Sequence, residues 1–403
     1  MKFTVDRDAL LPALSLAGKV QDSKATLPVL CYVKIQAEGE AVTISATDLR
    51  ISMTWHVPAD VEQKGACCLP HKKLLGLVKL TGGGSISLDD SGEGVSVRAV
   101  GLDYRLTALA ARNFPSLPSR PAQLHAADAA DLRALIDTTL HAASTDEERA
   151  HLCGGHLVSD DDSATMEATD GHRLAVAPRQ IKIGALDLTI PTRGLKAIRA
   201  LLDKADRTRI GEHKGTVTVI TDRASVSVRE VDQQSFRFPP VSHIITHSQR
   251  QIIVETAPLV AAFKRALVVA DASEQVRMSI GLAELQVIVD CEESKGRESV
   301  AISNPGVVDL TIGVNAGFML DALARSGARV RICVDGPLDP IEIRPVDTET
   351  LFLLMPCRMD GEEKRSAGAG EDTETLPAPG TEGVVSQADK SQDAALAVLE
   401  GGK

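Results

Sequence analysis

The order of apolar and polar residues in the first third of the chain predicts helices separated by short strands. Between Asp6 and Val20 the apolar residues fall at helical spacing, and Asp8 could cap the start of this helix. A second helix is expected from Leu69 to Leu80, because Pro70 stands near its start and the glycines at 82–84 would end it. Alternation of apolar and polar residues predicts six strands: 29–36, 41–46, 50–57, 85–88, 95–100 and 104–109.

The same order of elements recurs twice downstream, which indicates three copies of one structural unit. In the second copy, helices are expected at 128–143 and 190–201, the latter again opened by an apolar residue and a proline. In the third copy, helices are expected at 258–269 and 315–324. The strands expected in these two copies lie around Leu157 and at 165–169, 216–220, 224–229, 252–254, 277–280, 285–289, 330–334, 341–344 and 351–354.

A short segment in the second copy, ATDGHRLAV at 168–176, echoes ATDLRI at 46–51, with the upstream echo one residue tighter. Gly171 suits a tight turn, because glycine accepts a positive φ, and Asp170 can hydrogen-bond to its own backbone. Asp170 and His172 could also form an acid/base pair. A turn between two strands and a catalytic pair are therefore both open interpretations of this segment.

Three further motifs accompany this segment, and together the four resemble the bacterial DNA polymerase III beta subunit family, the replicative sliding clamps. They are MKFTV at 1–5, TLPVL at 26–30 and LMPCRM at 354–359. The resemblance implies an α+β fold of three repeated clamp domains, each with paired inner helices and outer antiparallel sheets. Two such chains would close into a ring as a head-to-tail dimer.

We place the boundaries of the three clamp domains at 1–122, 123–249 and 250–359. From 360 to 403 the composition shifts to Gly, Glu, Ala, Thr, Ser and Pro. Such a segment cannot bury enough apolar surface to order itself, so we expect a disordered C-terminal tail.

The composition, 43% hydrophobic and 25% charged, is that of an ordinary soluble protein. No apolar run reaches the roughly 18 residues that a membrane helix needs, and the N-terminus lacks a signal-peptide pattern, so we expect a cytoplasmic protein. The seven cysteines include no C-x-x-C pair, and the histidines lack ligand spacing. We therefore expect neither a metal nor a cofactor.

The net charge of -11 argues against a protein that coats its outer surface with basic residues to bind nucleic acid, but it allows a local basic lining. With only 7 Phe, 2 Tyr and 1 Trp, base stacking is disfavoured, so DNA contacts should be to phosphates. Lys24, Arg149 and Arg193 match DNA-contacting positions of the family, and Lys72 and Lys196 lie on the expected helices. A solvated helix face is the alternative for each of these residues.

The resemblance also implies a surface groove for short Gln- and Leu-containing peptides of the DNA polymerase III catalytic subunit, the clamp loader and repair polymerases. The matching positions combine aliphatic walls with a few polar side chains: Leu152, Thr169, Gly171, His172, Arg173, Leu174, Pro239, His243, Ile244, Leu338, Leu353, Leu354, Met355, Pro356, Cys357, Arg358 and Met359. They could instead form a core between the second and third units. The chain departs from the family at Cys153, His243 and Met359, which leaves peptide preference open.

In the expected dimer, Lys73, Tyr104 and Leu106 of the first unit would meet Val268 and Val269 in the third unit of the partner. We therefore expect a non-enzymatic processivity factor that encircles duplex DNA and tethers a polymerase to it. Two alternatives are a clamp-like paralogue with a specialised repair or resistance role and an enzyme that uses Asp170 and His172. The chain lacks a P-loop, a nucleophile elbow and a zinc-protease motif, which disfavours the enzyme.

Overall fold

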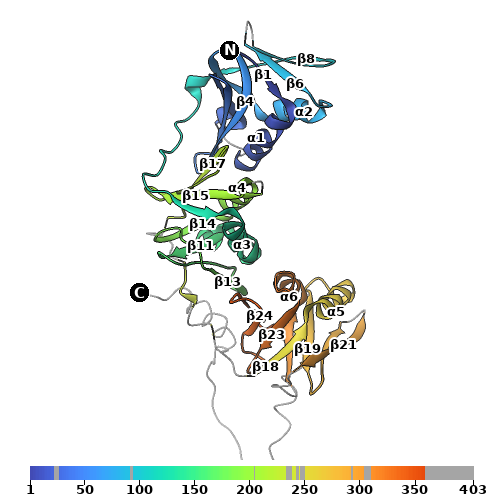
Figure 1. Ribbon diagram of the computed structural model, residues 1–403. Coiled ribbons are helices and arrows are strands. Elements are labelled where there is room, and N and C mark those ends of the chain that lie inside the picture. The colour runs from blue at the N-terminus through green and yellow to red at the C-terminus, as the bar shows by residue number, and fades with distance from the viewer. Residues whose placement is uncertain are drawn as a thin grey trace, which may run out of the picture. The chain divides into compact units, whose positions relative to one another are not determined.

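The structure, a computed structural model, divides into two compact units (Figure 1). The first unit comprises Met1–Ala168 and Ala177–Arg237, and the second comprises Thr169–Val176 and the residues from Phe238 onward. The residues that the structure describes are 1–21, 27–90, 94–203, 205–232, 238–241, 245, 250–291, 294–303 and 310–358. The expected tail at 360–403 lies outside these residues.

Two strand-to-helix steps occur in each third of the chain. In the first step, β1 (Lys2–Asp6) leads into α1 (Arg7–Val20), β10 (His125–Asp128) into α3 (Ala129–Thr139), and β18 (Gln251–Glu255) into α5 (Thr256–Val269). In the second step, β5 (Gly65–Pro70) leads into α2 (His71–Leu80), β14 (Leu186–Pro191) into α4 (Thr192–Leu202), and β22 (Leu310–Asn315) into α6 (Ala316–Leu323). This order confirms the expected threefold repeat of an α+β unit.

Within the described part of each unit, the strand pairs are antiparallel. The remaining strands are β2 (Tyr32–Glu38), β3 (Ala41–Thr47), β4 (Ile51–Gln63), β6 (Ser85–Asp89), β7 (Val95–Ala99), β8 (Leu102–Leu106), β9 (Leu109–Ala110), β11 (Gly154–Ser159), β12 (Ala164–Thr169), β13 (Arg173–Arg179), β15 (Arg207–Glu212), β16 (Thr216–Ile220), β17 (Ala224–Arg229), β19 (Gln275–Ile280), β20 (Glu284–Asp290), β21 (Lys295–Ser303), β23 (Arg329–Cys333), β24 (Ile341–Pro345) and β25 (Leu351–Leu354).

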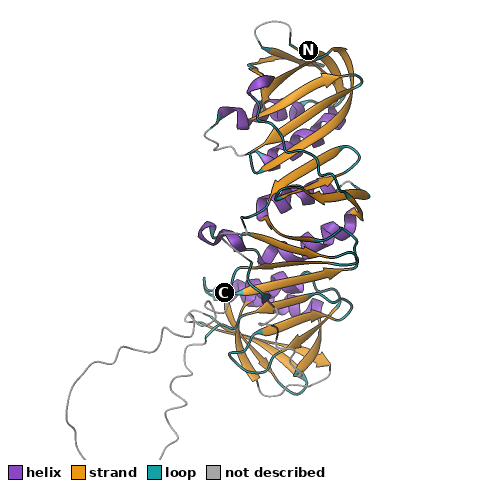
Figure 2. Ribbon diagram, turned by 90° about the vertical axis from the view of Figure 1, so that its left-hand side faces the viewer, coloured by secondary structure: helices purple, strands orange, loops and turns teal. Residues whose placement is uncertain are grey.

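The longest sheet of the first unit runs β10-β15-β16-β17-β4-β1-β6-β7-β8, and β14, β11 and β12 form a second group of strands in this unit. In the second unit the first half of β13 pairs with β25, and the order continues β24-β23-β18-β21-β20-β19-β22. Figure 2 shows helices packed against strands in each unit. Within the units, α1 packs on α2, α3 on α4, and α5 on α6.

Apolar side chains between helices and strands form the core of each unit. Phe3, Leu10 and Leu14 are at most 2% exposed in the first unit, as is Phe263 in the second. His71, at the start of α2, is also buried, and its Nε2 donates to the carbonyl oxygen of Leu14 at 2.7 Å. Burial lowers the pKa of His71, which favours the neutral ring, so this hydrogen bond joins α2 to α1 without a buried charge.

Several expected element boundaries and one expected helix cap differ from the structure. Asp6, not Asp8, caps α1, because an N-cap carboxylate must precede the first helical residue to reach the free amides. Its Oδ1 accepts from the amides of Asp8 and Ala9 at 2.9 and 3.2 Å. The strand expected at 104–109 is β8 at Leu102–Leu106. It begins two residues earlier than expected, directly after Gly101, whose φ of 72° fits the turn that precedes the strand.

Candidate peptide-binding and nucleic-acid interfaces

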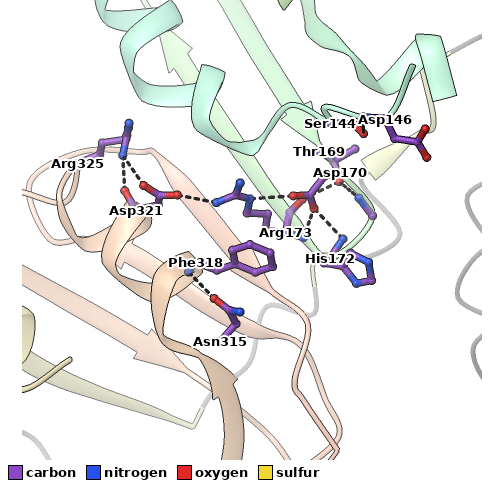
Figure 3. Close-up of polar contacts among 11 residues, drawn as sticks. Ser144, Asp146, Thr169, Asp170, His172, Arg173, Asn315, Phe318, Asp321 and Arg325 are labelled. Carbon is purple, nitrogen blue, oxygen red and sulfur yellow. Dashed lines mark hydrogen bonds and ion pairs between the residues drawn. The ribbon is translucent and has the colours of Figure 1, made fainter. Parts of the chain in front are cut away.

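The segment Thr169–Arg173 in the second unit folds into a turn that its own side chains hold closed; we call it the second Thr-Asp turn. The Thr169 hydroxyl donates to the Arg173 carbonyl oxygen at 2.6 Å, and Asp170 Oδ1 accepts from the amides of His172 and Arg173 at 2.9 and 3.0 Å. Gly171 supplies the left-handed residue, with φ of 91°. Asp170 is therefore occupied by its own turn, and its carboxylate is not aimed at the exposed His172 ring (Figure 3).

Arg173 lies between this turn and helix α6 of the same unit. Its Nε donates to Asp170 Oδ2 at 2.9 Å, and its Nη1 donates to Asp321 Oδ2 at 2.7 Å. The guanidinium carbon stands 4.2 Å from the centre of the Phe318 ring, which is a cation–π contact (Figure 3). With only 14% of its side chain exposed, Arg173 is bound to protein groups and has little surface left for a ligand.

A small apolar cluster adjoins the second Thr-Asp turn. Leu174 pairs with Leu353 across β13 and β25, and the amide of Met355 donates to the His172 carbonyl oxygen at 2.8 Å. The apolar cluster consists of buried Leu174, Phe238, Val241 and Leu353 with partly buried Val176 and Met355. The cluster is mostly buried, with Val176 and Met355 as its partly exposed members and exposed His172 beside it. Small peptide sites combine apolar and polar side chains in this way.

The other residues expected at the peptide site lie in different surroundings. Leu354 is buried in β25, Pro239 is buried, Pro356 and Cys357 are partly buried, and Arg358 is exposed. Leu338 is 64% exposed in the loop between β23 and β24 and is not part of the apolar cluster. Leu152 is buried in the first unit, and His243, Ile244 and Met359 lie outside the described residues.

The upstream echo, Thr47–Ile51, forms the same turn in the first unit, and we call it the first Thr-Asp turn. The Thr47 hydroxyl donates to the Ile51 carbonyl oxygen at 3.0 Å, and Asp48 Oδ1 accepts from the amides of Arg50 and Ile51 at 2.9 and 2.6 Å. Leu49, with φ of 76°, stands where the second turn has Gly171. The two turns therefore have the same length, and Arg50 occupies the position of His172, although the shorter sequence echo sets Arg50 against Arg173.

Of the basic residues expected to contact DNA, Arg193 makes the most contacts with other protein groups, and 52% of its side chain is exposed. At the start of α4 its Nη1 stands 3.1 Å from Asp48 Oδ2, and its Nη2 donates to the carbonyl oxygens of Val20 and Gln21 at 3.2 and 3.3 Å. Arg149 pairs with Asp146 at 3.6 Å. Lys72 and Lys196 are exposed on α2 and α4, and neither forms an ion pair with the described residues. Lys24 lies outside the described part of the chain.

The expected dimer residues differ in exposure. Tyr104 is 57% exposed on β8, which ends the long sheet, and Lys73 is exposed on α2. Val268 and Val269, at the end of α5, are 83% and 42% exposed. Leu106 is only 7% exposed and belongs to the core of the first unit, so its side chain offers little surface to a partner.

Two properties concern cofactors and membranes. Within the described ranges, no three His, Cys, Asp or Glu side chains are grouped so that they could hold a metal ion. In the same part of the chain, no helix is both long and apolar enough to cross a membrane.

Comparison with known families gives a match along most of the chain. The N-terminal, central and C-terminal domains of the DNA polymerase III beta subunit match residues 1–118, 127–240 and 243–358 in that order. The chain belongs to the DNA polymerase III beta subunit family. It is thus a sliding-clamp subunit, and Asp170 and His172 are part of a turn in a non-catalytic protein.

Individual members of the family agree with this assignment. The beta sliding clamp of Pseudomonas aeruginosa is 27% identical over 374 residues, covering 89% of this chain and 100% of the relative. That of Caulobacter vibrioides is 29% identical over 378 residues, with the same coverage. Among solved structures, the DNA polymerase III subunit beta of Pseudomonas aeruginosa superposes with a TM-score of 0.82 at 25% identity, covering 89% of this chain and 100% of that one.

The sliding clamp of Bacillus subtilis gives a TM-score of 0.83 at 25% identity, covering 89% of this chain and 99% of that one. Each of these relatives is described as a clamp or a polymerase beta subunit, and none supports the alternatives of a specialised paralogue or an enzyme.

Sequence patterns missed two residues, Phe318 and Asp321, that shape the site in this family member. Phe318 and Asp321 of α6 hold Arg173, and Asn315 caps α6 by accepting from the amide of Phe318 at 2.8 Å. The apolar spacing predicted α6, and Asn315 was placed at its start. No pattern could link Arg173 to Asp321, because 148 residues separate them.

Proposed function

We propose that two copies of this chain join head to tail into a ring that encircles duplex DNA in the cytoplasm and tethers DNA polymerase to it. The observation that carries the proposal is the match of three consecutive clamp domains over residues 1–358. A closed ring holds DNA topologically, so the acidic chain, with its net charge of -11, needs only loose phosphate contacts.

The cations proposed to face DNA are Lys72, Lys196, Arg149 and Lys24. Exposed lysines without an ion pair can contact any phosphate, and such contacts carry no sequence information. That combination would let the ring slide along the duplex.

The apolar cluster is the proposed docking site for short Gln- and Leu-containing peptides. The proposed partners are the DNA polymerase III catalytic subunit, the clamp loader and repair polymerases. Support comes from the flexible Met355 beside buried Leu174 and Leu353, since thioether and aliphatic surfaces suit variable apolar anchors. In a related structure, that of the C. crescentus beta sliding clamp, polyethylene glycol is bound at a proposed beta-motif tethering region.

The ring is tested by comparing release from circular and linear DNA at the same salt concentration. Protein placed on a nicked circle by a clamp loader should persist in salt that removes it from linear duplex, and one double-strand cut should release it. Binding to short linear duplex should be weak, with a log-log salt slope of about 0.9 per neutralised phosphate. Equal release rates from intact and cut circles would exclude the encircling mechanism.

A further inference from the structure

The two Thr-Asp turns have the same hydrogen bonds and also the same position relative to the next strand along each sheet. In the first unit, Ile51 pairs with Val228 of β17, and the amide of Arg229 donates to the Arg50 carbonyl oxygen at 2.8 Å. In the second unit, Arg173 pairs with Leu354 of β25, and Met355 makes the matching bond to His172 at 2.8 Å. The same backbone arrangement of turn and neighbouring strand therefore occurs twice in the chain, and we call each occurrence a junction.

At the first of these junctions, Arg193 of the central domain is fastened to the N-terminal domain. Asp48 uses Oδ1 to close its own turn and Oδ2 to hold Arg193. Only 6% of the Asp48 side chain is exposed, so this carboxylate would be a nearly buried, unpaired charge without Arg193. The other guanidinium nitrogen satisfies carbonyls at the C-terminal end of α1, where free acceptors and the negative end of the helix dipole favour a cation.

At the second junction, Arg173 makes the corresponding connection. As at Asp48, the two carboxylate oxygens of Asp170 have different partners: Oδ1 accepts from the turn amides, and Oδ2 accepts from the Arg173 guanidinium. Here the arginine belongs to the turn itself and reaches across to Asp321 and Phe318 of the C-terminal domain. The carboxylate of each turn thus holds an arginine that spans two domains.

We propose that Asp48–Arg193 and Asp170–Arg173–Asp321 are two domain clasps, in which the arginines fix the junctions and do not bind ligands directly. Arg193 acts as a positioning residue for the helices that face DNA, and Arg173 acts as a positioning residue for Leu174 in the apolar cluster. The domain clasps go beyond the proposed ring and peptide site. Of the tests below, the two binding measurements rest on that proposed function, and the hydrogen–deuterium exchange measurement does not.

The first clasp is tested by hydrogen–deuterium exchange of the full-length protein without DNA. Asp48→Asn keeps an oxygen for the turn amides but removes the charge that holds Arg193. This variant and Arg193→Gln should each speed exchange in the last turn of α1 roughly three- to tenfold, because charge-assisted hydrogen bonds that limit local opening are lost. The combined variant should exchange no faster than the stronger single variant, because both changes remove one interaction.

Lys196→Gln is the matched control, since it removes an exposed cation from the same helix without touching Asp48. Its exchange should equal that of the wild type. Wild-type exchange in Arg193→Gln, or effects that add in the combined variant, would overturn the clasp. Because this measurement contains no DNA, its result stands even if the ring proposal fails.

Two binding measurements separate a clasp from a direct ligand. Arg193→Gln should leave the salt slope for linear duplex unchanged, whereas loss of a phosphate contact would lower the slope by about 0.9. At the second junction, Arg173→Gln and Asp321→Asn should weaken peptide binding equally, and the double variant should weaken it no further. A lower salt slope, or a double variant that binds more weakly than either single variant, would overturn the assignment.

Discussion

Glu167 offers a test of the structure in which the size of the effect depends on pH. It lies in β12 opposite His156 of β11, and burial raises the pKa of its carboxyl group from 4.5 to about 7. The folded protein therefore binds this proton more tightly than the unfolded chain does. Between pH 4.5 and about 7 the folded state carries more protons, so the free energy of unfolding should fall as pH rises through this window.

The magnitude follows from the two pKa values. At 1.36 kcal/mol per pH unit the difference corresponds to roughly 3 kcal/mol, and because the side chain is not fully buried we expect about half of that, roughly 1.5 kcal/mol. Glu167→Gln keeps the shape but cannot ionise. It should match the wild type near pH 4 and exceed the stability of the wild type by about 1.5 kcal/mol at pH 8.

The assay is urea unfolding at fixed protein concentration from pH 4 to 8, with the variant and the wild type compared at each pH so that other titrating groups cancel. Glu298→Gln is a control of opposite sign, because the hydrogen bond from Arg265 lowers the pKa of Glu298. That variant should be the less stable one at neutral pH. A stability difference between Glu167→Gln and the wild type that does not change with pH would refute the reasoning.

Two further predictions concern the proposed interfaces. Met355→Ala should weaken binding of a peptide ending in Leu-Phe by about 1 to 2 kcal/mol in calorimetry, since a few pocket-filling anchors dominate small interfaces; unchanged affinity would exclude the apolar cluster as the site. Val268→Glu with Val269→Glu should convert the dimer to monomer in sedimentation, because burial of two exposed valines is replaced by burial of two charges. Leu282→Glu, at a 72% exposed position in a turn, is the control expected to remain dimeric, and an intact valine variant dimer would remove α5 from the interface.

The helices and the threefold repeat could be predicted from the sequence because their signals are local. Apolar spacing and an aspartate, asparagine or proline at the start of the helix mark α1, α2, α4 and α6 to within a few residues. Strands whose side chains are mostly charged or polar and exposed lack the alternation that would predict them. In β21, Lys295–Ser303, Val300 alone is buried, so alternation of apolar and polar residues is almost absent from this segment.

The two turns of the site could be predicted from the sequence, but the ion pairs that their side chains form could not. The segment at 168–176 identified the second Thr-Asp turn, and its echo identified the first. The ion-pair partner of each carboxylate depends on tertiary contacts. Asp48 pairs with Arg193 and Asp321 pairs with Arg173, and in both pairs the two residues lie far apart in the sequence. A sequence match assigns charge to a surface, whereas only the fold shows whether that charge is already neutralised.

The two junctions share a backbone but differ in the side chains that occupy it. Where the second junction pairs Leu174 with Leu353, the first pairs Ser52 with Ser227, and Ser52 is hydrogen-bonded to Thr47 at 2.8 Å. A serine whose hydroxyl is already hydrogen-bonded within the protein offers no apolar contact area to a leucine or phenylalanine of a peptide. On the proposed function these two residue pairs would limit each chain to one docking site, and replacing Ser52 and Ser227 with leucine would be the most direct way to engineer a second.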